Sequence, residues 1–188
     1  KAKSERVVAA LCQKISGYDR QRSIFIIALG GGVIGDLAGF IASIYKRGVP
    51  YVQIPTTLLA QVDSGIGGKV GIDLPIAKNL IGAFYQPRVV LTDIAALVTL
   101  PRRQLRSGLS EVIKYGVIKD RQLFEYIEKN LSKIISGNLS ALEYVIARAS
   151  AIKARIVEKD ELDKNSVRAI LNYGHTIGHA IETACGYS

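Results

Sequence analysis

The chain's only two histidines, His175 and His179, lie four residues apart in the segment NYGHTIGHAIE, residues 172–182. In a helix this spacing places both imidazoles on one face. The simplest interpretation is a pair of surface histidines on an amphipathic helix. Neutral imidazole is also the commonest metal ligand and a proton carrier near neutral pH, and Asn172 and Glu182 lie close to the same stripe. The segment therefore predicts a metal or acid–base site, completed by a ligand from elsewhere.

A carboxylate for such a site occurs at Glu111, three residues before Lys114. On spacing alone, these two residues form an ordinary ion pair along one helix face. The alternative makes Glu111 a metal ligand beside His175, because catalytic zinc commonly takes three protein ligands from His, Asp or Glu and keeps one position open. Spacing leaves open whether His179 is also a ligand.

Upstream of the histidines, Arg168 and Asn172 continue the helical spacing, at steps of four, three and four residues through His175 to His179. A helix stripe of these types is unsuited to a dry core. We therefore expect one helix over residues 166–183 that faces a polar cleft and recognises an anionic, hydroxylated ligand.

A glycine cluster follows the apolar run of residues 24–29, in LGGGVIGD, residues 29–36. Gly30, Gly32 and Gly35 match G-x-G-x-x-G, a pattern in which the backbone approaches a pyrophosphate at a helix N-terminus. Glycine turns between strand and helix are also common without a ligand. The acid usually found about 20 residues later is missing, and Thr56 and Thr57 stand near that point. The pattern predicts a dinucleotide site of an unusual lineage.

A second glycine-rich loop, DSGIGGK, covers residues 63–69. Its spacing differs from that of a P-loop, and no Ser or Thr follows the lysine. It is either a flexible connection or a loop in which Asp63 and Lys69 face a shared ligand. Lys78 and Asn79 follow shortly, and a lysine beside an amide suits hydroxyls or phosphate.

Hydrophobic periodicity divides the chain in two. Strands predicted at residues 24–29, 51–55 and 89–93, with a small extended piece at 70–73, alternate with helices at 4–17 and 35–45 and a short helix at 57–63. Helices alone are predicted at residues 102–118, 122–136, 140–158 and 166–183. We expect an α/β plus all-α protein: a mostly parallel α/β nucleotide-binding domain at residues 1–100, then a helical metal-binding domain at residues 101–188, both incomplete.

Composition narrows the classes of partner. The chain has 188 residues, is 48% hydrophobic and 22% charged, and contains no Met, so we expect a globular internal piece of a longer protein. No apolar run reaches the roughly 18–20 residues of a membrane span. Cys12 and Cys185 give no disulfide framework, which predicts a reducing, cytoplasmic setting. The net charge of +9 is scattered, which favours a small anion such as phosphate over nucleic acid.

Five stretches together resemble the 3-dehydroquinate synthase family of the sugar-phosphate cyclase group. They are GGGVIGDLAGF, RGVPYVQIPTTLLAQVDSGIGGKVGID, KNLIGAFYQP, SEVIKYG and LNYGHTIGHAIE, and they follow the family's order. The resemblance implies an NAD-binding domain, a helical metal domain and an active site between them. It implies an enzyme of the shikimate pathway of aromatic amino acid biosynthesis that converts 3-deoxy-D-arabino-heptulosonate 7-phosphate to 3-dehydroquinate and phosphate.

The resemblance also implies roles for individual positions. The residues expected to contact NAD are Gly31, Gly32, Val33, Asp36, Thr56, Thr57, Leu59, Lys78, Thr99 and Leu100. The residues expected to act on the substrate are Asp63, Lys69, Lys114 and His179, and those expected to bind it are Arg47, Asn79, Lys153, Arg168 and Asn172. Glu111 and His175 match two of three ligands for zinc, with cobalt as an alternative, and His179 matches a proton-handling histidine.

The same resemblance implies a homodimer, because Arg47 matches an arginine that reaches across a dimer interface toward the substrate phosphate. The family's third zinc ligand falls beyond Ser188, so we expect this segment alone to bind zinc poorly. Two other enzymes are alternatives: a related cyclase such as 2-deoxy-scyllo-inosose synthase, and a metal-dependent polyol dehydrogenase. The intact KNLIGAF segment and the position of His179 favour the first assignment.

Overall fold

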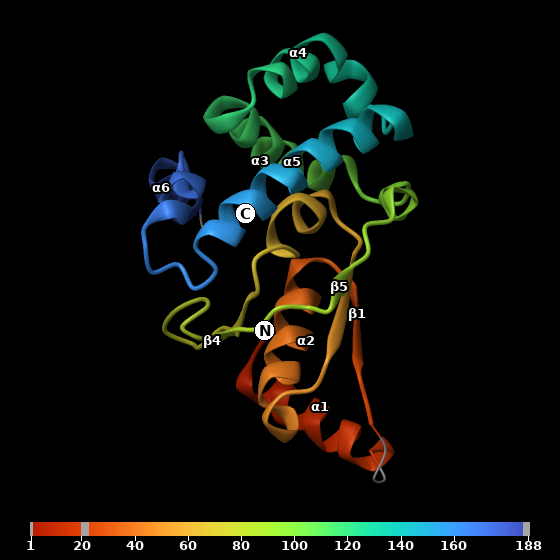
Figure 1. The fold of residues 1–188 in the computed structure, drawn as a ribbon, viewed down its shortest axis with the longest axis vertical. Coiled ribbons are helices and arrows are strands. Elements are labelled where there is room, and N and C mark those ends of the chain that lie inside the picture. The colour runs from red at the N-terminus through yellow and green to blue at the C-terminus, as the bar shows by residue number, and fades with distance from the viewer. Residues whose placement is uncertain (1, 20–22, 186–188) are drawn as a thin grey trace.

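The computed structural model describes residues 2–19 and 23–185. Strands and helices alternate in the first half of the chain, and the second half contains helices (Figure 1). The first half contains α1 (Glu5–Tyr18), β1 (Ile26–Gly30), α2 (Gly32–Ile44), η1 (Tyr45–Arg47), β2 (Tyr51–Pro55), η2 (Ala60–Ser64), β3 (Lys69–Ile72), β4 (Ile81–Phe84), β5 (Val89–Val90) and η3 (Ile94–Leu97). The second contains α3 (Arg102–Lys119), α4 (Arg121–Ile135), α5 (Leu139–Lys159), η4 (Val167–Asn172) and α6 (His175–Ala184).

A three-stranded parallel sheet, in the order β1-β2-β5, forms the centre of the first half. β1 pairs with β2 from Ile26↔Tyr51 to Gly30↔Pro55, and α2 packs against both strands. Since the strands are parallel, their carboxyl ends meet at one edge of the sheet. The glycine turn after Gly30 therefore lies beside the residues that follow Pro55, and the Thr56 N–H donates to the Gly30 carbonyl over 2.9 Å.

A two-stranded antiparallel ribbon, β3-β4, lies beside α2. Its register runs from Lys69↔Phe84 to Ile72↔Ile81. The sequence indicated the extended piece at β3 but not β4, because three of the four β4 residues are exposed and carry no alternation. The third parallel strand is also shorter than expected, since β5 contains only Val89 and Val90.

The helical half is built around one large apolar core. Side-chain caps begin two of its helices: Asp120 accepts from the Leu123 N–H at the start of α4, and Asn138 accepts from the Ala141 N–H at the start of α5, each over 3.0 Å. Such caps satisfy N–H groups that the first helical turn leaves unpaired. Two residues of the first half, Leu58 and Val62, are fully buried in this same core, so η2 is packed against α3 and α5.

The prediction of a single helix over residues 166–183 is wrong. The structure contains the short 3-10 helix η4 and the separate helix α6, and Gly174 between them has a φ of 81°. That left-handed conformation is easily adopted by glycine and interrupts an α-helix. The stripe from Arg168 through Asn172 to His175 and His179 is therefore not one helix face.

The predicted fold class, a mostly parallel α/β part followed by a helical part, is confirmed. The division into two domains at residue 100 stays a prediction. Within the part of the chain that the structure describes, no helix combines the length and apolarity that crossing a bilayer requires.

Candidate active site

The glycine turn between β1 and α2 packs against the chain that follows β2. A Cβ atom on Gly31 would lie 3.0 Å from Thr57 Cγ2, and one on Gly32 would lie 2.7 Å from Ser64 Oγ. The second distance would force the Ser64 hydroxyl to rotate away, so glycine at position 32 allows Ser64 its observed approach. The turn thus packs Gly31 against Thr57 and Gly32 against Ser64. It leaves the first N–H groups of α2 without helical partners, which is a favourable place for an anion.

Asp36, one turn into α2, forms an ion pair with Lys3 across 2.6 Å. The Lys3 ammonium is buried and also donates to the Asn79 amide oxygen over 2.5 Å. Burial raises the pKa of the Asp36 carboxyl, and the hydrogen bond and charge of Lys3 oppose this only in part. Lys3 therefore holds Asp36, which follows the first glycine motif, beside the side-chain amide of Asn79.

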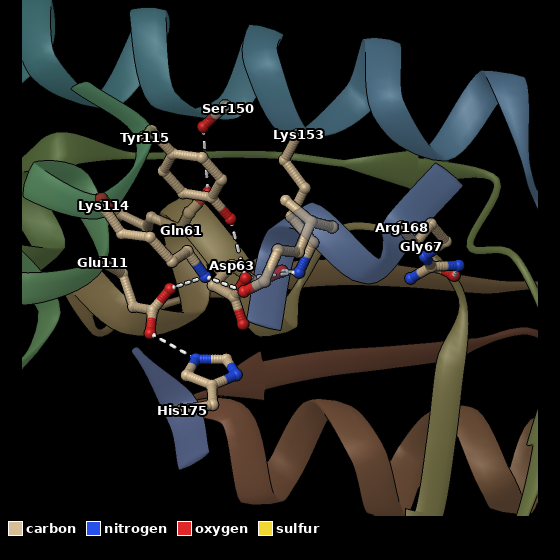
Figure 2. A network of polar contacts seen from close by, with 11 residues as sticks. Gln61, Asp63, Gly67, Glu111, Lys114, Tyr115, Ser150, Lys153, Arg168 and His175 are labelled. Carbon is tan, nitrogen blue, oxygen red and sulfur yellow. Dashed lines mark hydrogen bonds and ion pairs between the residues drawn. The ribbon is translucent and has the colours of Figure 1, made fainter. Parts of the chain in front are cut away.

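Asp63, at the end of η2, is the centre of a second polar cluster (Figure 2). The Lys153 ammonium from α5 donates to Asp63 Oδ1 over 2.6 Å and to the Asp63 carbonyl over 2.7 Å. The Tyr115 hydroxyl from α3 donates to the same Oδ1 over 2.8 Å. The turn itself is fixed by Gln61, whose amide nitrogen donates to the Pro55 and Asp93 carbonyls.

The charges of this cluster shift the pKa values of its members. Burial alone would raise the pKa of the Asp63 carboxyl, but the charge of Lys153 and the hydrogen bonds from Lys153 and Tyr115 together lower it. Burial lowers the pKa of the Lys153 ammonium, and the Asp63 carboxylate offsets this only in part. Nearby cations, Arg168 and Lys114, act in the same direction as burial. The Asp63 carboxylate is therefore favoured in its ionised form, while burial works against the charge of Lys153.

Glu111 and His175 approach each other from α3 and α6, as the sequence predicted. Their Oε1 and Nε2 atoms lie 3.2 Å apart, and Figure 2 shows the imidazole facing the carboxylate. The other oxygen of Glu111 forms an ion pair with Lys114, whose ammonium also donates to the Leu171 carbonyl over 2.8 Å. Glu111 thus forms the ordinary ion pair with Lys114 and also faces His175, as a candidate metal ligand would.

The spacing of Glu111 and His175 suits two ligands of one metal ion. Zinc bonds of about 2.0–2.2 Å at a tetrahedral angle separate two ligand atoms by about 3.4 Å. The observed distance of 3.2 Å between Glu111 Oε1 and His175 Nε2 is close to that separation. Among the side chains that the structure describes, no group of three or more His, Cys, Asp or Glu residues is placed to hold a metal. The pair therefore fits as part of a metal site.

Two cavities meet beside these clusters. The first, of about 470 Å³, is lined by Asp36, Asp63, Asn79 and three cations, Lys69, Lys153 and Arg168. The second, of about 730 Å³, is lined by Glu111, Lys114 and His175. Asp63 and Asn79 line both cavities. A ligand that extends past these two residues would touch both the cations and the Glu111–His175 pair.

Two of the three cations of the first cavity, Lys69 and Arg168, contact the loop between α5 and η4. The Arg168 guanidinium is buried and donates to the carbonyls of Gly67 and Glu161, over 3.4 Å and 3.1 Å. Lys69 pairs with Asp163 over 2.6 Å, and both side chains are partly exposed. With Lys153 engaged by Asp63, the cations best placed to meet an incoming anion are Lys69 and Arg168.

Asp160 fixes this loop from its start. Its buried carboxylate accepts main-chain N–H groups from Lys164, Asn165 and Val167, over 2.8–3.2 Å. Burial alone would raise the pKa of Asp160, but these backbone hydrogen bonds lower it. The anchored loop places Arg168 against Gly67 of the glycine-rich segment.

Several predicted site residues lie elsewhere or are less constrained. Arg47 is at the C-terminal end of the α2–η1 segment, roughly 20 Å along the helix axis from the glycine turn. Val33 is exposed in the first turn of α2 and Leu59 lines the second cavity. The remaining four, Thr99, Leu100, Lys78 and Asn172, line neither cavity. The side chain of His179 lies outside the described residues.

Sequence analysis missed two members of the site, Lys3 and Tyr115. Lys3 lies in a short charged stretch before α1 that carries no motif. Tyr115 fits the apolar face of α3, where a tyrosine is expected to pack. The available signals were the hydroxyl itself, since a polar group in a core position requires a buried partner, and the neighbouring site residue Lys114.

Known proteins resemble this chain in sequence and in fold. A 3-dehydroquinate synthase from Desulforamulus reducens is 60% identical over 169 residues, which cover 90% of this chain and 46% of that protein. A structure of 2-deoxy-scyllo-inosose synthase complexed with carbaglucose-6-phosphate, NAD+ and Co2+ superposes with a TM-score of 0.88 at 34% identity, covering 97% of this chain and 49% of that one. A 2-epi-5-epi-valiolone synthase from Streptomyces hygroscopicus subsp. jinggangensis, with NAD+ and Zn2+ bound, gives 0.86 at 32% identity, covering 93% and 49%.

The fold is therefore that of the sugar-phosphate cyclase class. Family models narrow the assignment. The model of the 3-dehydroquinate synthase N-terminal domain matches residues 1–107, and that of the C-terminal domain matches residues 108–188. The chain belongs to the 3-dehydroquinate synthase family. It spans about half the length of the curated relatives it matches.

Proposed function

We propose that the protein to which this chain belongs converts 3-deoxy-D-arabino-heptulosonate 7-phosphate to 3-dehydroquinate and phosphate. The observation that carries this proposal is the meeting of two cavities at Asp63 and Asn79, one lined by three cations and the other by the Glu111–His175 pair. A phosphorylated, hydroxylated acid needs cations for its two anionic groups and a polar centre for its ring hydroxyls. Relatives with this activity in their names, 60% identical in one case, support the choice of substrate.

Lys69 and Arg168 are the proposed binders of the substrate's anionic groups, together with Lys153 and Asn79. The guanidinium of Arg168 is already fixed by two carbonyls, which lowers the entropy lost on binding an anion. Asp63 Oδ1 is occupied by Lys153 and Tyr115, so Oδ2 is the atom available to accept a substrate hydroxyl. Asn172 and His179 complete the proposed set from η4 and α6.

NAD is the proposed cofactor of the glycine turn, because the close approach of Gly31 and Gly32 to Thr57 and Ser64 forms a cradle that a Cβ would fill. Bound NAD would accept a hydride from a ring carbinol and later return it, so that the cofactor is regenerated in each catalytic cycle. The proposed contact residues are Gly31, Gly32, Val33, Asp36, Thr56, Thr57, Leu59, Lys78, Thr99 and Leu100. Of these, the turn residues and Asp36 have the strongest structural support.

Zinc, with cobalt as an alternative, is the proposed metal, and Glu111 and His175 would hold it. A carboxylate and an imidazole 3.2 Å apart are a suitable donor set for either ion. A bound metal would act as a Lewis acid toward a substrate oxygen. Lys114, paired with Glu111, would balance the ligand carboxylate and keep its orientation.

A homodimer with Arg47 at the interface, a cytoplasmic location and the absence of nucleic-acid or membrane partners remain predictions. The position of Arg47, away from the two cavities of its own chain, supports an action on a neighbouring subunit's site.

The test is an assay of phosphate release by the full-length protein, given the heptulosonate phosphate, NAD and zinc. We expect phosphate release without net NADH formation, because the hydride is returned. Glucose 6-phosphate serves as the parallel substrate for the 2-deoxy-scyllo-inosose reaction. Release from glucose 6-phosphate alone would overturn the proposal in favour of that cyclase, and accumulation of NADH would favour a polyol dehydrogenase.

A further inference from the structure

Tyr115 is a core tyrosine with one polar atom directed at the site. Its side chain is completely buried among the apolar residues of the helical half. The hydroxyl reaches out of this core and donates to Asp63 Oδ1 over 2.8 Å. Figure 2 shows the ring between α3 and α5, with its oxygen pointing to Asp63. Since the ring cannot move without disturbing the core, the hydroxyl is a fixed donor.

Asp63 is anchored on one side only. Tyr115 and Lys153 both donate to Oδ1, and Lys153 also holds the Asp63 main-chain carbonyl. Two donors on one oxygen leave the carboxylate a single orientation, with Oδ2 as the free acceptor. Asp63 lines both cavities, so this orientation decides what Oδ2 can reach.

Tyr115 also contacts the second cluster. The Lys114 ammonium lies 5.0 Å from the centre of the Tyr115 ring, within the range of a cation–π interaction. Lys114 in turn pairs with Glu111. Tyr115 therefore contacts both the Asp63–Lys153 pair, through its hydroxyl, and the Glu111–Lys114 pair, through its ring.

We propose that Tyr115 is a positioning residue, whose buried hydroxyl fixes the Asp63 carboxylate so that Oδ2 faces the bound substrate. This inference rests on the proposed function, because it takes Asp63 to contact substrate. Burial raises the pKa of Tyr115, and the neighbouring Asp63 carboxylate raises it further. The hydroxyl thus keeps its proton and serves only as a donor.

The test is Tyr115→Phe in the full-length protein with NAD and zinc. We expect kcat/KM for the heptulosonate phosphate to fall about tenfold, the usual effect of losing one hydrogen bond to a charged group. In the Asp63→Asn background the same change should alter kcat/KM by less than about twofold, because Tyr115 acts through Asp63. Multiplying effects in the double variant would overturn the inference.

A matched control is Tyr51→Phe, which also removes a buried hydroxyl, one that donates to the Tyr85 carbonyl over 3.0 Å. It should leave kcat/KM within about twofold of the wild type. A loss equal to that of Tyr115→Phe would show that both changes act through folding. If Tyr115→Phe does not fold, 3-fluorotyrosine at position 115, which keeps the hydroxyl, should retain kcat/KM within about threefold; a larger loss would count against the inference.

A second measurement separates this inference from the proposed function. The carbon-13 shift of the Asp63 carboxyl, followed against pH, should titrate at a higher pH in Tyr115→Phe than in the wild type, because a donor to the carboxylate is lost. An unchanged titration would overturn the role of Tyr115 whatever the substrate is. A shifted titration in a protein that releases no phosphate would support the Tyr115 contact and reject the proposed reaction.

Discussion

Lys153 and Asp63, ninety residues apart in the sequence, are joined by two hydrogen bonds from a single ammonium group, to the carboxylate and to the carbonyl of the same aspartate. Lys153 belongs to α5 and Asp63 to η2. This pair fixes the helical half of the chain against the turn that leads from the sheet. Asp63 lines both the cation-lined cavity and the Glu111–His175 cavity, and Lys153 lines the first.

Lys153→Met should destabilise the full-length protein by about 2 kcal/mol. A broken buried ion pair typically costs about 3–5 kcal/mol because one charge is left without a partner, and the partial exposure of Asp63, 28% of its side chain, reduces that cost. Urea unfolding measures the change. Lys159→Met, an exposed lysine in the same helix, is the control and should change stability by less than about 0.5 kcal/mol. Equal stabilities for the two variants would contradict this account of the pair.

The Asp63 pair also predicts a pH dependence of stability. The pKa of Asp63 is lowered in the folded state, since the charge of Lys153 and its hydrogen bonds outweigh burial. The unfolded state therefore binds its proton first as pH falls, and the stability from ionised Asp63 is lost on going below about pH 4 and through the lower folded pKa. The difference in urea midpoint between wild type and Asp63→Asn should grow as pH rises through that window. A constant difference between pH 2.5 and 5 would show that Asp63 is not stabilised as a carboxylate.

Gly32→Ala should weaken NAD binding at least tenfold in the full-length protein. The added Cβ would lie 2.7 Å from Ser64 Oγ, so the Ser64 hydroxyl must rotate away, and the new methyl group fills part of the cradle proposed for NAD. Fluorescence titration with NADH measures the affinity without turnover. Gly17→Ala is the control, because a Cβ there meets nothing within 4 Å, and its affinity should equal that of the wild type. Wild-type affinity in Gly32→Ala would place the dinucleotide elsewhere.

His175→Ala should lower the zinc affinity of the full-length protein at least tenfold and abolish metal-dependent turnover, since loss of a ligand is at least as costly as loss of a residue that supports one. Metal content after dialysis measures the first effect independently of activity. Glu143→Gln, an exposed acid on α5, is the control and should keep the wild-type zinc content. Full zinc occupancy in His175→Ala would remove His175 from the ligand set.

Much of the site could be predicted from local sequence. The glycine turn is found where expected because an apolar strand, a glycine cluster and a helix follow one another directly. The bounds of α3, α4 and α5 agree with prediction to within a residue or two, because the periodic apolar positions from which they were predicted are a local signal. The approach of Glu111 to His175 was anticipated from their chemistry, although no spacing rule places α3 beside α6.

Other features depend on contacts that the sequence does not display. β4 is a strand because it pairs with β3, and its exposed residues show no pattern of their own. The break at Gly174 separates Arg168 from His175 although their spacing was helical. Lys3 and Tyr115 reach Asp36 and Asp63 through folding of segments 33 and 52 residues apart, so no nearby motif indicated them.

The Asp160 carboxylate binds main-chain N–H groups of the segment that follows it and none of that segment's side chains. Residues 161–166 can therefore be replaced without loss of these main-chain hydrogen bonds, except at Asp163, whose side chain pairs with Lys69. Family members should vary more at the other positions of this short interval than at Asp160 and Arg168.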